Sequence, residues 1–448
     1  MTVFRASGWH TSALAILAMA GPAPARPQEA AASAALRSSI SSFVAPFLAN
    51  GDFEGVVLVR HGDDTRVFES YTRAEGDSQS FGPDTPFMVG SITKTFTAEA
   101  IARLASAGLL SLDDPVTRFV PELTGGDAIT VEHVLNHSSG IPDYYSAPGF
   151  AALAPREMPP DRLSVWISGL PLDFAPGTAS AYSNTGYNLL ALIVERVSGM
   201  PFAAYLRREI IGPVGLANTG TLGETAPPGI PNGLRPAPAP RVVGPPLPLH
   251  WSWLVGSGSI YASAEDLVRW GREVAEREIG GPDGWHPYGW GVRTAGDRRF
   301  LVQNGRIPGY AAMLVVSRAD DLVVVALSRI ESDAVTRVAN GVATLALGGV
   351  APPEAERAEA ALTEEGAASL EGVYDFGPDF ALTVRRQEGG LGVAVGTGAD
   401  LRFGILQPLG SDRFFFREAY LSVDFTREED GTVNGMLWAG GGPFPKRR

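Results

Sequence analysis

The hydrophobic pattern of the chain changes its period near residue 350, and this change constrains the fold more than any other feature of the sequence. Before that point, apolar residues recur at helical spacing or gather in short strand-like runs. After it, apolar and polar residues alternate, as in Leu382/Val384 and Phe414/Phe416, which is typical of half-buried antiparallel strands. The sequence therefore predicts two domains of different architecture, the second of them rich in β-strands.

The first domain is predicted to mix helices with one sheet. A helix should open at Ser91, just after Gly90, and stop near Gly108, because apolar residues recur at helical spacing between them. The other predicted elements are a helix near 30–49, a β-hairpin over 55–68, a helix after Asn184 that ends at Ser198 and Gly199, an extended proline-rich loop over 226–248 that walls a cleft, strands near 299–302, 311–316 and 322–326, and a closing helix over 332–347.

The N-terminal residues have the layout of a cleavable secretory signal. Arg5 precedes a short apolar run from Ser12 to Ala20, and Ala23-Pro24-Ala25 follows it. The run is about half the length needed to span a bilayer, so we expect a periplasmic or secreted protein with no membrane span in the mature chain. The predicted segments are a signal peptide over 1–25, a hydrolase domain over 30–350, a linker over 351–366 and a β-rich domain over 367–448.

The composition excludes several kinds of chemistry. The chain has no cysteine, which rules out disulfides, thiolate metal sites and a cysteine nucleophile. Its formal net charge of −13 would repel nucleic acid, so we expect no nucleic-acid partner. Among 448 residues there are 34 Arg and only two Lys, Lys94 and Lys446. Because a guanidinium stays protonated, a site that needs an amine to lose its proton must use lysine, and Lys94 therefore stands out.

Ser91 and Lys94 have the spacing of a nucleophile and its base. Residues three apart on a helix share a face, with Cβ atoms about 5–6 Å apart. Burial would lower the pKa of Lys94 so that its neutral amine accepts a proton as Ser91 attacks a carbonyl. The helix N-terminus would stabilise the resulting oxyanion. Alone the pair is weak evidence, because serine is common enough to stand there by chance.

Five blocks, the first of which contains Ser91 and Lys94, make the chain resemble the serine β-lactamase and penicillin-binding protein superfamily, in particular its class C β-lactamase, D-aminopeptidase and esterase-like branch. The resemblance covers about residues 40–345. The blocks are Phe-Met-Val-Gly-Ser-Ile-Thr-Lys at 87–94, Leu-Asn-His-Ser-Ser-Gly-Ile-Pro at 135–142, Tyr182-Ser183-Asn184 after Phe-Ala-Pro-Gly-Thr at 174–178, Gly-Ser-Ile-Tyr-Ala-Ser-Ala-Glu-Asp-Leu at 258–267, and Gln303-Asn304-Gly305.

The resemblance implies a fold and a set of roles. The first domain would be an α+β sandwich, an antiparallel sheet flanked by helices with an all-helical subdomain, and a small all-β barrel would follow. Tyr182 would share protons with Ser91 and Lys94, and Asn184 would orient Lys94 or the substrate. His137 would be structural. No metal and no cofactor would be required.

The third motif departs from the family pattern. Where the family has Lys or His, this chain has Gln303, followed by Gly305 and Arg306, and a glutamine can only form hydrogen bonds. Efficient β-lactamase activity is therefore not expected. We take Gln303, Gly305 and Arg306 as substrate-binding candidates, with the Arg306 N–H as a second oxyanion donor. Its side chain either restores positive charge to the site or is exposed to solvent.

The sequence thus predicts an exported serine hydrolase that cleaves a small ester or amide, of the esterase or D-amino-acid peptidase type. The alternatives are a penicillin-binding-like sensor that acylates without turnover, or a weak β-lactamase acting on β-lactam-like substrates. The β-rich domain resembles a lipocalin-like barrel. We expect it to pack against the first domain and shape its rim, with its aromatic residues Phe414, Phe415, Phe416 and Trp438 in a core rather than around a ligand. The oligomeric state is not predicted.

Overall fold

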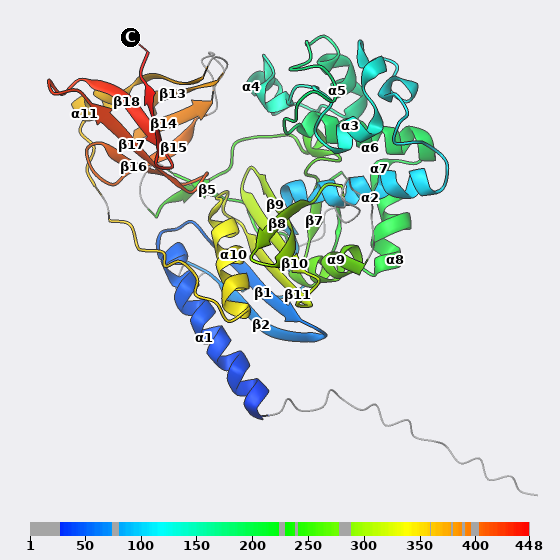
Figure 1. The fold of residues 1–448 in the computed structure, drawn as a ribbon, viewed down its shortest axis with the longest axis horizontal. Coiled ribbons are helices and arrows are strands. Elements are labelled where there is room, and N and C mark those ends of the chain that lie inside the picture. Colours follow the sequence, from blue (N-terminus) through cyan, green and yellow to red (C-terminus); the bar gives the residue numbers. More distant parts are fainter. Residues whose placement is uncertain are drawn as a thin grey trace, which may run out of the picture.

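The computed structural model describes residues 27–73, 80–223, 229–237, 241–276, 288–358, 360–377, 380–387, 390–395 and 403–447. The predicted signal segment over 1–25 and parts of the proline-rich loop over 226–248 lie outside the described residues. The described chain forms a sheet-and-helix domain followed by a barrel domain, which stands beside it (Figure 1).

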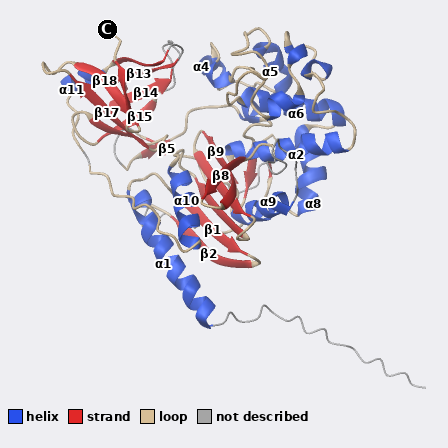
Figure 2. Ribbon diagram, viewed as in Figure 1, coloured by secondary structure: helices blue, strands red, loops and turns tan. Residues whose placement is uncertain are grey.

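A six-stranded antiparallel sheet is the centre of the sheet-and-helix domain (Figure 2). Its strands follow the order β2-β1-β11-β10-β9-β8, so the first hairpin pairs with the last strand of the domain. Their bounds are β1 (Gly55–His61), β2 (Asp64–Tyr71), β8 (Gly291–Ala295), β9 (Arg298–Ile307), β10 (Tyr310–Ser317) and β11 (Leu322–Ser328).

Helices cover both faces of this sheet because side chains alternate along its strands. On β1, Val57 and Val59 are buried together with residues of α1 (Pro27–Ala49) and α10 (Ala334–Ala346). The neighbouring Val56 and Leu58 join the core formed with the opposite layer of helices. That layer contains α2 (Thr93–Ser106), α6 (Asn184–Ser198) and α9 (Ala264–Glu276).

Shorter elements complete the domain. They are the helices α3 (Val131–Leu135), α4 (Phe150–Leu153), α5 (Pro160–Ile167), α7 (Phe202–Leu206) and α8 (Gly212–Val214), the small sheet of β3 (Phe87–Met88), β7 (Ile260–Ala262) and β4 (Gly220–Thr221), and the pair β5 (Arg235–Pro236) and β6 (Val243–Gly244). In the part of the chain that the structure describes, no single helix is long and apolar enough to cross a bilayer. Only α6 taken with the segment Phe202–Val214 passes that test, and this pair is bent by 76°.

The barrel domain is a nearly closed eight-stranded sheet whose strands pair in sequence order. An antiparallel bridge between Tyr374 and Lys446 brings its first and last strands together. Leu382, Val384 and Phe414 are among the residues that fill its interior. The elements are α11 (Glu364–Leu370), β12 (Gly372–Gly377), β13 (Phe380–Gln387), β14 (Gly390–Val395), β15 (Gly404–Pro408), β16 (Arg413–Phe416), β17 (Leu421–Arg427), β18 (Val433–Trp438) and β19 (Gly441–Pro445).

The predicted fold class is confirmed: an antiparallel sheet lies between helices, and a β-barrel follows. The bounds of several elements differ from the prediction. The helix predicted to open at Ser91 begins at Thr93, because Gly90–Ile92 forms a 3-10 turn in front of it. Strand β9 runs to Ile307, so it carries the whole third motif, and helix α10 begins at Ala334 rather than at Ser332. Ser332 stays outside the helix because its hydroxyl donates to the carbonyl of Arg417 in the barrel domain.

Buried ion pairs join the two domains. Asp52, on the loop before β1, is fully buried and accepts a hydrogen bond from Nε of Arg417 at 2.8 Å. Its other oxygen accepts from Arg357, which lies in the segment predicted as a linker. Arg417 also donates to the carbonyls of Gly51 and Val242, at 2.9 and 3.0 Å. We call Asp52, Arg357 and Arg417 the domain junction.

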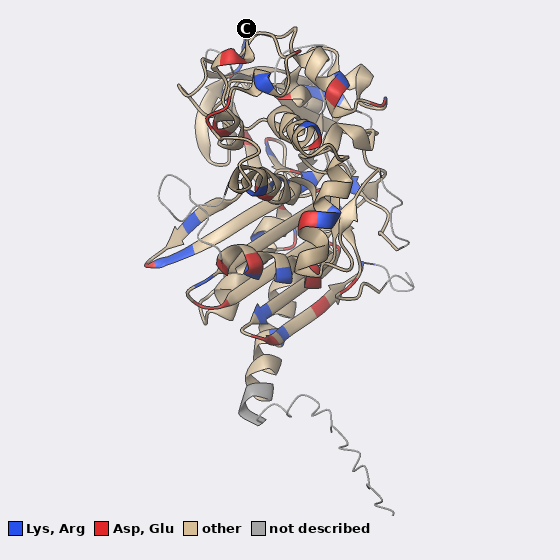
Figure 3. Ribbon diagram, turned by 90° about the vertical axis from the view of Figure 1, so that its right-hand side faces the viewer, with Lys and Arg blue, Asp and Glu red and all other residues tan. Residues whose placement is uncertain are grey.

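The charged residues elsewhere are dispersed. In the view of Figure 3, Lys and Arg alternate with Asp and Glu over both helices and strands, without a block of one sign. Ion pairs between exposed side chains contribute little to stability, because water and salt screen the charges. The domain junction differs from them, because no water can solvate a partner left behind there.

We predict that Asp52→Asn lowers the free energy of unfolding by about 3–5 kcal/mol, because the buried carboxylate that two guanidinium groups share is replaced by a neutral amide. Urea denaturation followed by fluorescence would measure it. The matched control is Asp63→Asn, which removes a carboxylate that is 95% exposed and paired with Arg272, and which should cost less than about 1 kcal/mol. Equal effects of the two substitutions would contradict the role of the junction.

Candidate active site

Ser91 lies in a tight turn that strand β9 touches directly. The turn, Gly90–Ile92, leads into α2, and Gly90 has a positive φ of 52°. A Cβ on Gly90 would come within 2.7 Å of the Arg306 backbone nitrogen, and one on Gly305 within 1.9 Å of the Val89 carbonyl oxygen. Both positions therefore require glycine, and the role of Gly305 is to let the strand approach the serine.

The Ser91 hydroxyl contacts two proton-carrying groups. Its oxygen is 2.6 Å from the hydroxyl of Tyr182 and 3.1 Å from Nζ of Lys94. Lys94 is on the first turn of α2, one helical turn from Ser91, and Tyr182 directly precedes Ser183, the residue that caps α6. The segments at the start of α2 and at the start of α6, which are far apart in the sequence, thus bring the three side chains into contact.

The Lys94 amine is buried, with 1% of the residue exposed. It donates to the side-chain oxygen of Asn184 and to the carbonyl of Ser257, both at 2.8 Å. Burial lowers its pKa from 10.5 to about 7. A neutral amine has two N–H groups and one lone pair. Since both acceptors take an N–H, the lone pair is left for the Ser91 hydroxyl.

Asp143 fixes the orientation of Asn184. It accepts from the Asn184 side-chain nitrogen at 2.8 Å and from the Asn184 backbone N–H at 2.9 Å, so that the amide oxygen faces Lys94. Its carboxylate also acts on Lys94 through space and raises the pKa of the amine against the effect of burial. Asp143 was not predicted as a site residue, although it directly follows the block that ends at Pro142. Ser257 was not predicted either, because it contributes through a backbone carbonyl.

Tyr182 is a protonated phenol in this setting. Desolvation by the surrounding protein raises the pKa of its hydroxyl well above 10, even though 51% of the residue is exposed. The His137 ring lies 4.7 Å from the Tyr182 ring, centroid to centroid, and accepts a hydrogen bond from the Ser183 backbone N–H at 3.1 Å. Burial and the nearby Lys94 lower the pKa of His137 to about 3. The histidine is thus a neutral structural residue.

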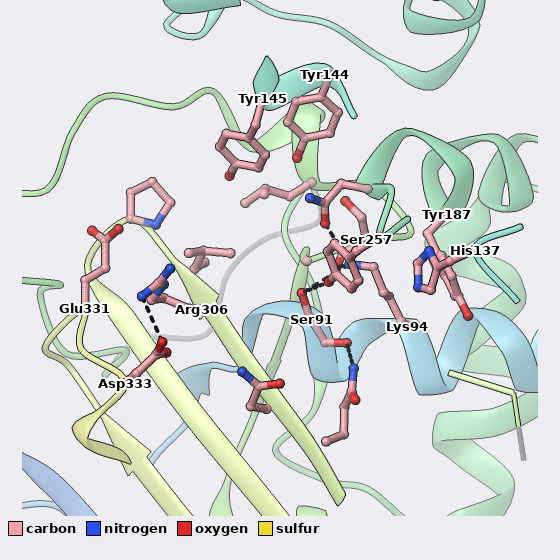
Figure 4. A pocket seen from close by; sticks show the side chains of 18 of the residues that line it. Ser91, Lys94, His137, Tyr144, Tyr145, Tyr187, Ser257, Arg306, Glu331 and Asp333 are labelled. Carbon is pink, nitrogen blue, oxygen red and sulfur yellow. Dashed lines mark hydrogen bonds and ion pairs between the residues drawn. The ribbon is translucent and has the colours of Figure 1, made fainter. Parts of the chain in front are cut away.

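The third-motif residues occupy three different positions. Gln303 donates from its side chain to the backbone carbonyl of Ser91 at 3.2 Å, so it holds the serine turn, and it forms no hydrogen bond with Lys94 or Tyr182 among the described residues. Gly305 lies against the turn itself. The Arg306 side chain extends away from Ser91 and pairs with Asp333 at 3.2 Å (Figure 4). The two alternatives for this side chain were positive charge in the site and exposure to solvent; the side chain lines the cavity, is 38% exposed, and has its charge paired with Asp333.

A cavity of about 820 Å³ opens over these residues. Tyr144 and Tyr145 line one side, Leu247 comes from the loop predicted to wall the cleft, and Leu254 comes from the turn Trp251–Leu254 that follows it. The barrel domain contributes a further part of the lining with Phe403, Gly404, Phe416 and Glu418. Phe416 thus lines the cavity, unlike Phe414, which is in the barrel core. Among the described residues, no three His, Asp or Glu side chains gather as metal ligands would.

A protein-family model named Beta-lactamase matches residues 40–348. The chain belongs to the beta-lactamase family. The matched residues include the turn of Ser91, the start of α6 at Asn184 and strand β9 with Gln303. The match therefore covers all the segments that form the site.

Two curated relatives, of which the chain spans about half the length, and one solved structure are similar to the chain. It is 30% identical over 224 residues to the D-alanyl-D-alanine-carboxypeptidase/endopeptidase AmpH of Escherichia coli (strain K12), covering 48% of this chain and 56% of AmpH. It is 32% identical over 185 residues to the esterase EstB of Burkholderia gladioli, covering 37% and 45%. The octameric penicillin-binding protein homologue from Pyrococcus abyssi has the same fold, with a TM-score of 0.60 at 21% identity, over 90% of this chain and 98% of that chain.

We predict that Lys94 titrates near pH 7 and that Asp143→Asn lowers this midpoint by about one pH unit, because a negative charge that favours the ammonium is removed. Lysine labelled with ¹³C at Cε gives a direct measurement, since the chain has only two lysines. The variant Lys446→Arg assigns the two resonances. A Lys94 midpoint near 10, or one that Asp143→Asn leaves in place, would contradict the assignment.

Proposed function

We propose that this protein is a serine hydrolase that cleaves a small ester or amide through an acyl-enzyme on Ser91. One observation carries the proposal: the Ser91 hydroxyl is in hydrogen-bond contact with both the Lys94 amine and the Tyr182 hydroxyl. The nucleophile therefore has a base with a pKa of about 7 on one side and a proton donor on the other.

The proposed reaction begins when neutral Lys94 takes the proton of Ser91 and the serine oxygen attacks the substrate carbonyl carbon. The backbone N–H groups of Ser91 and Arg306, on the two segments that meet at Gly90 and Gly305, support the oxyanion. Tyr182 then protonates the leaving alcohol or amine, and the Lys94 ammonium returns a proton to Tyr182. Water attacks the serine ester with the same groups acting in reverse, which releases the acid and restores Ser91.

Esters and amides of the kind that the relatives' names describe are the proposed substrates. EstB is named an esterase and AmpH a D-alanyl-D-alanine carboxypeptidase/endopeptidase. Gln303 is neutral and bonded to the Ser91 backbone, so it offers no cation to a β-lactam carboxylate. This supports esterase or peptidase activity over β-lactamase activity.

We also propose that the protein is exported. The support is the sequence of residues 1–25, in which Arg5, the apolar run from Ser12 to Ala20 and Ala23-Pro24-Ala25 follow the order of a secretory signal. Expression in a bacterium followed by N-terminal sequencing of the periplasmic fraction tests this, with cleavage after Ala25 as the expected result.

We predict that Ser91→Ala and Lys94→Arg each lower the rate of p-nitrophenyl ester hydrolysis by about 10³-fold or more. Ser91→Ala lacks the nucleophile, and the guanidinium of Lys94→Arg stays protonated and cannot accept the serine proton. Intact-mass analysis after a fluorophosphonate probe should show one adduct on the wild type and none on Ser91→Ala. Ser180→Ala is the matched control, since Ser180 is an exposed serine of the neighbouring segment. Full activity in Ser91→Ala would overturn the proposal, and labelling without turnover would indicate a sensor.

We predict that Gln303→Lys lowers the KM for nitrocefin, which carries a carboxylate, by about tenfold, because a charge-assisted hydrogen bond becomes available. Gln303→Met is the neutral control and should bring no such gain. Steady-state kinetics at fixed ionic strength would measure both variants. A similar KM for the two would show that the missing cation is not what limits β-lactam binding.

A further inference from the structure

The active-site cavity continues from Ser91 to the junction of the two domains. At its far end lie five charged side chains that the proposed reaction does not use: Arg235, Arg306, Glu331, Asp333 and Glu418. Figure 4 shows Arg306, Asp333 and Glu331 together on the side of the cavity opposite His137 and Tyr187. A substrate that extends from its scissile bond toward this end of the cavity would therefore contact charged side chains.

Both cations at this end already have partners. Nη1 of Arg306 donates to the Glu418 backbone carbonyl at 2.7 Å and pairs with Asp333 at 3.2 Å. Nη2 of Arg235 pairs with the Glu418 carboxylate at 3.3 Å and donates to the Phe403 carbonyl at 3.3 Å. The two arginines and these two carboxylates therefore balance one another.

Glu331 is the third carboxylate at this end of the cavity and is not part of these ion pairs. One of its oxygens accepts a hydrogen bond from the Gly309 backbone N–H at 3.1 Å, and the other has no hydrogen-bond partner among the described residues. No arginine or lysine of the described chain forms an ion pair with it. Burial raises its pKa to about 7, although the charges of Arg306 and Arg235 act in the opposite direction.

We propose that Glu331 binds a protonated amine of the substrate, so that the substrate is an aminoacyl ester or amide with a free ammonium group in its acyl part. This rests on the proposed function. The acyl part is chosen because the acyl carbonyl oxygen would lie at the Arg306 backbone N–H, and the Arg306 side chain leads from there to the charged end. An ammonium would supply the missing counter-charge and a donor for the free oxygen of Glu331.

The test compares aminoacyl p-nitroanilides that have a free amine with the same compounds N-acetylated, in both D and L forms. For the wild type, kcat/KM should favour the free amine by about tenfold or more, as one charge-assisted hydrogen bond requires. Glu331→Gln should reduce this ratio to near one. Glu356→Gln is the control, because Glu356 is 60% exposed and pairs with Arg241 on the surface, and it should keep the wild-type ratio.

The same ratio should rise between pH 5.5 and 7, where the amine stays protonated and Glu331 loses its proton. Titration of Lys94 affects both compounds equally and cancels in the ratio. Glu331→Gln should give a flat ratio over this range. A flat ratio in the wild type would overturn the proposal.

A binding measurement separates this proposal from the function it rests on. Calorimetry with Ser91→Ala, which cannot turn over, compares amino-acid amides with their N-acetyl forms. A preference for the free amine that disappears in Ser91→Ala/Glu331→Gln supports the ammonium site even if no ester is hydrolysed. Equal binding of the two forms would overturn it, while hydrolysis of simple esters would still support the proposed function.

Discussion

The Lys94 amine is shut off from water and must find its hydrogen bonds inside the protein. Three segments distant in sequence meet to provide them: the turn before α2 with Ser91, the start of α6 with Asn184, and the segment before β7 with the Ser257 carbonyl. The turn that carries Ser91 packs against β9 and β10, whereas α6 packs against α2 and α3. The arrangement leaves the amine able to exist without charge, which is the property an acyl-transfer base needs near neutral pH.

How much of the site could be predicted from the sequence depends on how far apart in the sequence the contacting residues are. Ser91 and Lys94 were accessible, because helical spacing alone places them together. Tyr182 and Asn184 lie about ninety residues further on, and only the family resemblance connected them to Lys94. Asp143 and Ser257 were missed for physical reasons: one acts through a second side chain, and the other through a backbone carbonyl that any residue could supply.

The barrel domain shows a different limit. Alternating residues such as Leu382 and Val384 were enough to predict its strands and its core. The sequence analysis expected it to pack against the first domain, but the contacts that fix its position were not predictable, because they join Asp52 to Arg417 and Arg357 across more than three hundred residues. That contact turns β16 and the residues after it toward the cavity, and for this reason Phe416 and Glu418 line it.

The position of Arg417 in the chain has a consequence for the order in which the protein is assembled. Domains fold largely as units, and those nearer the N-terminus are completed first during synthesis. Ser91, Lys94 and Tyr182 all belong to the earlier domain, whereas Phe416, Arg417 and Glu418 come after it. The reacting groups can therefore assemble before the wall that faces them, and the cavity stays open on that side until the barrel domain has folded.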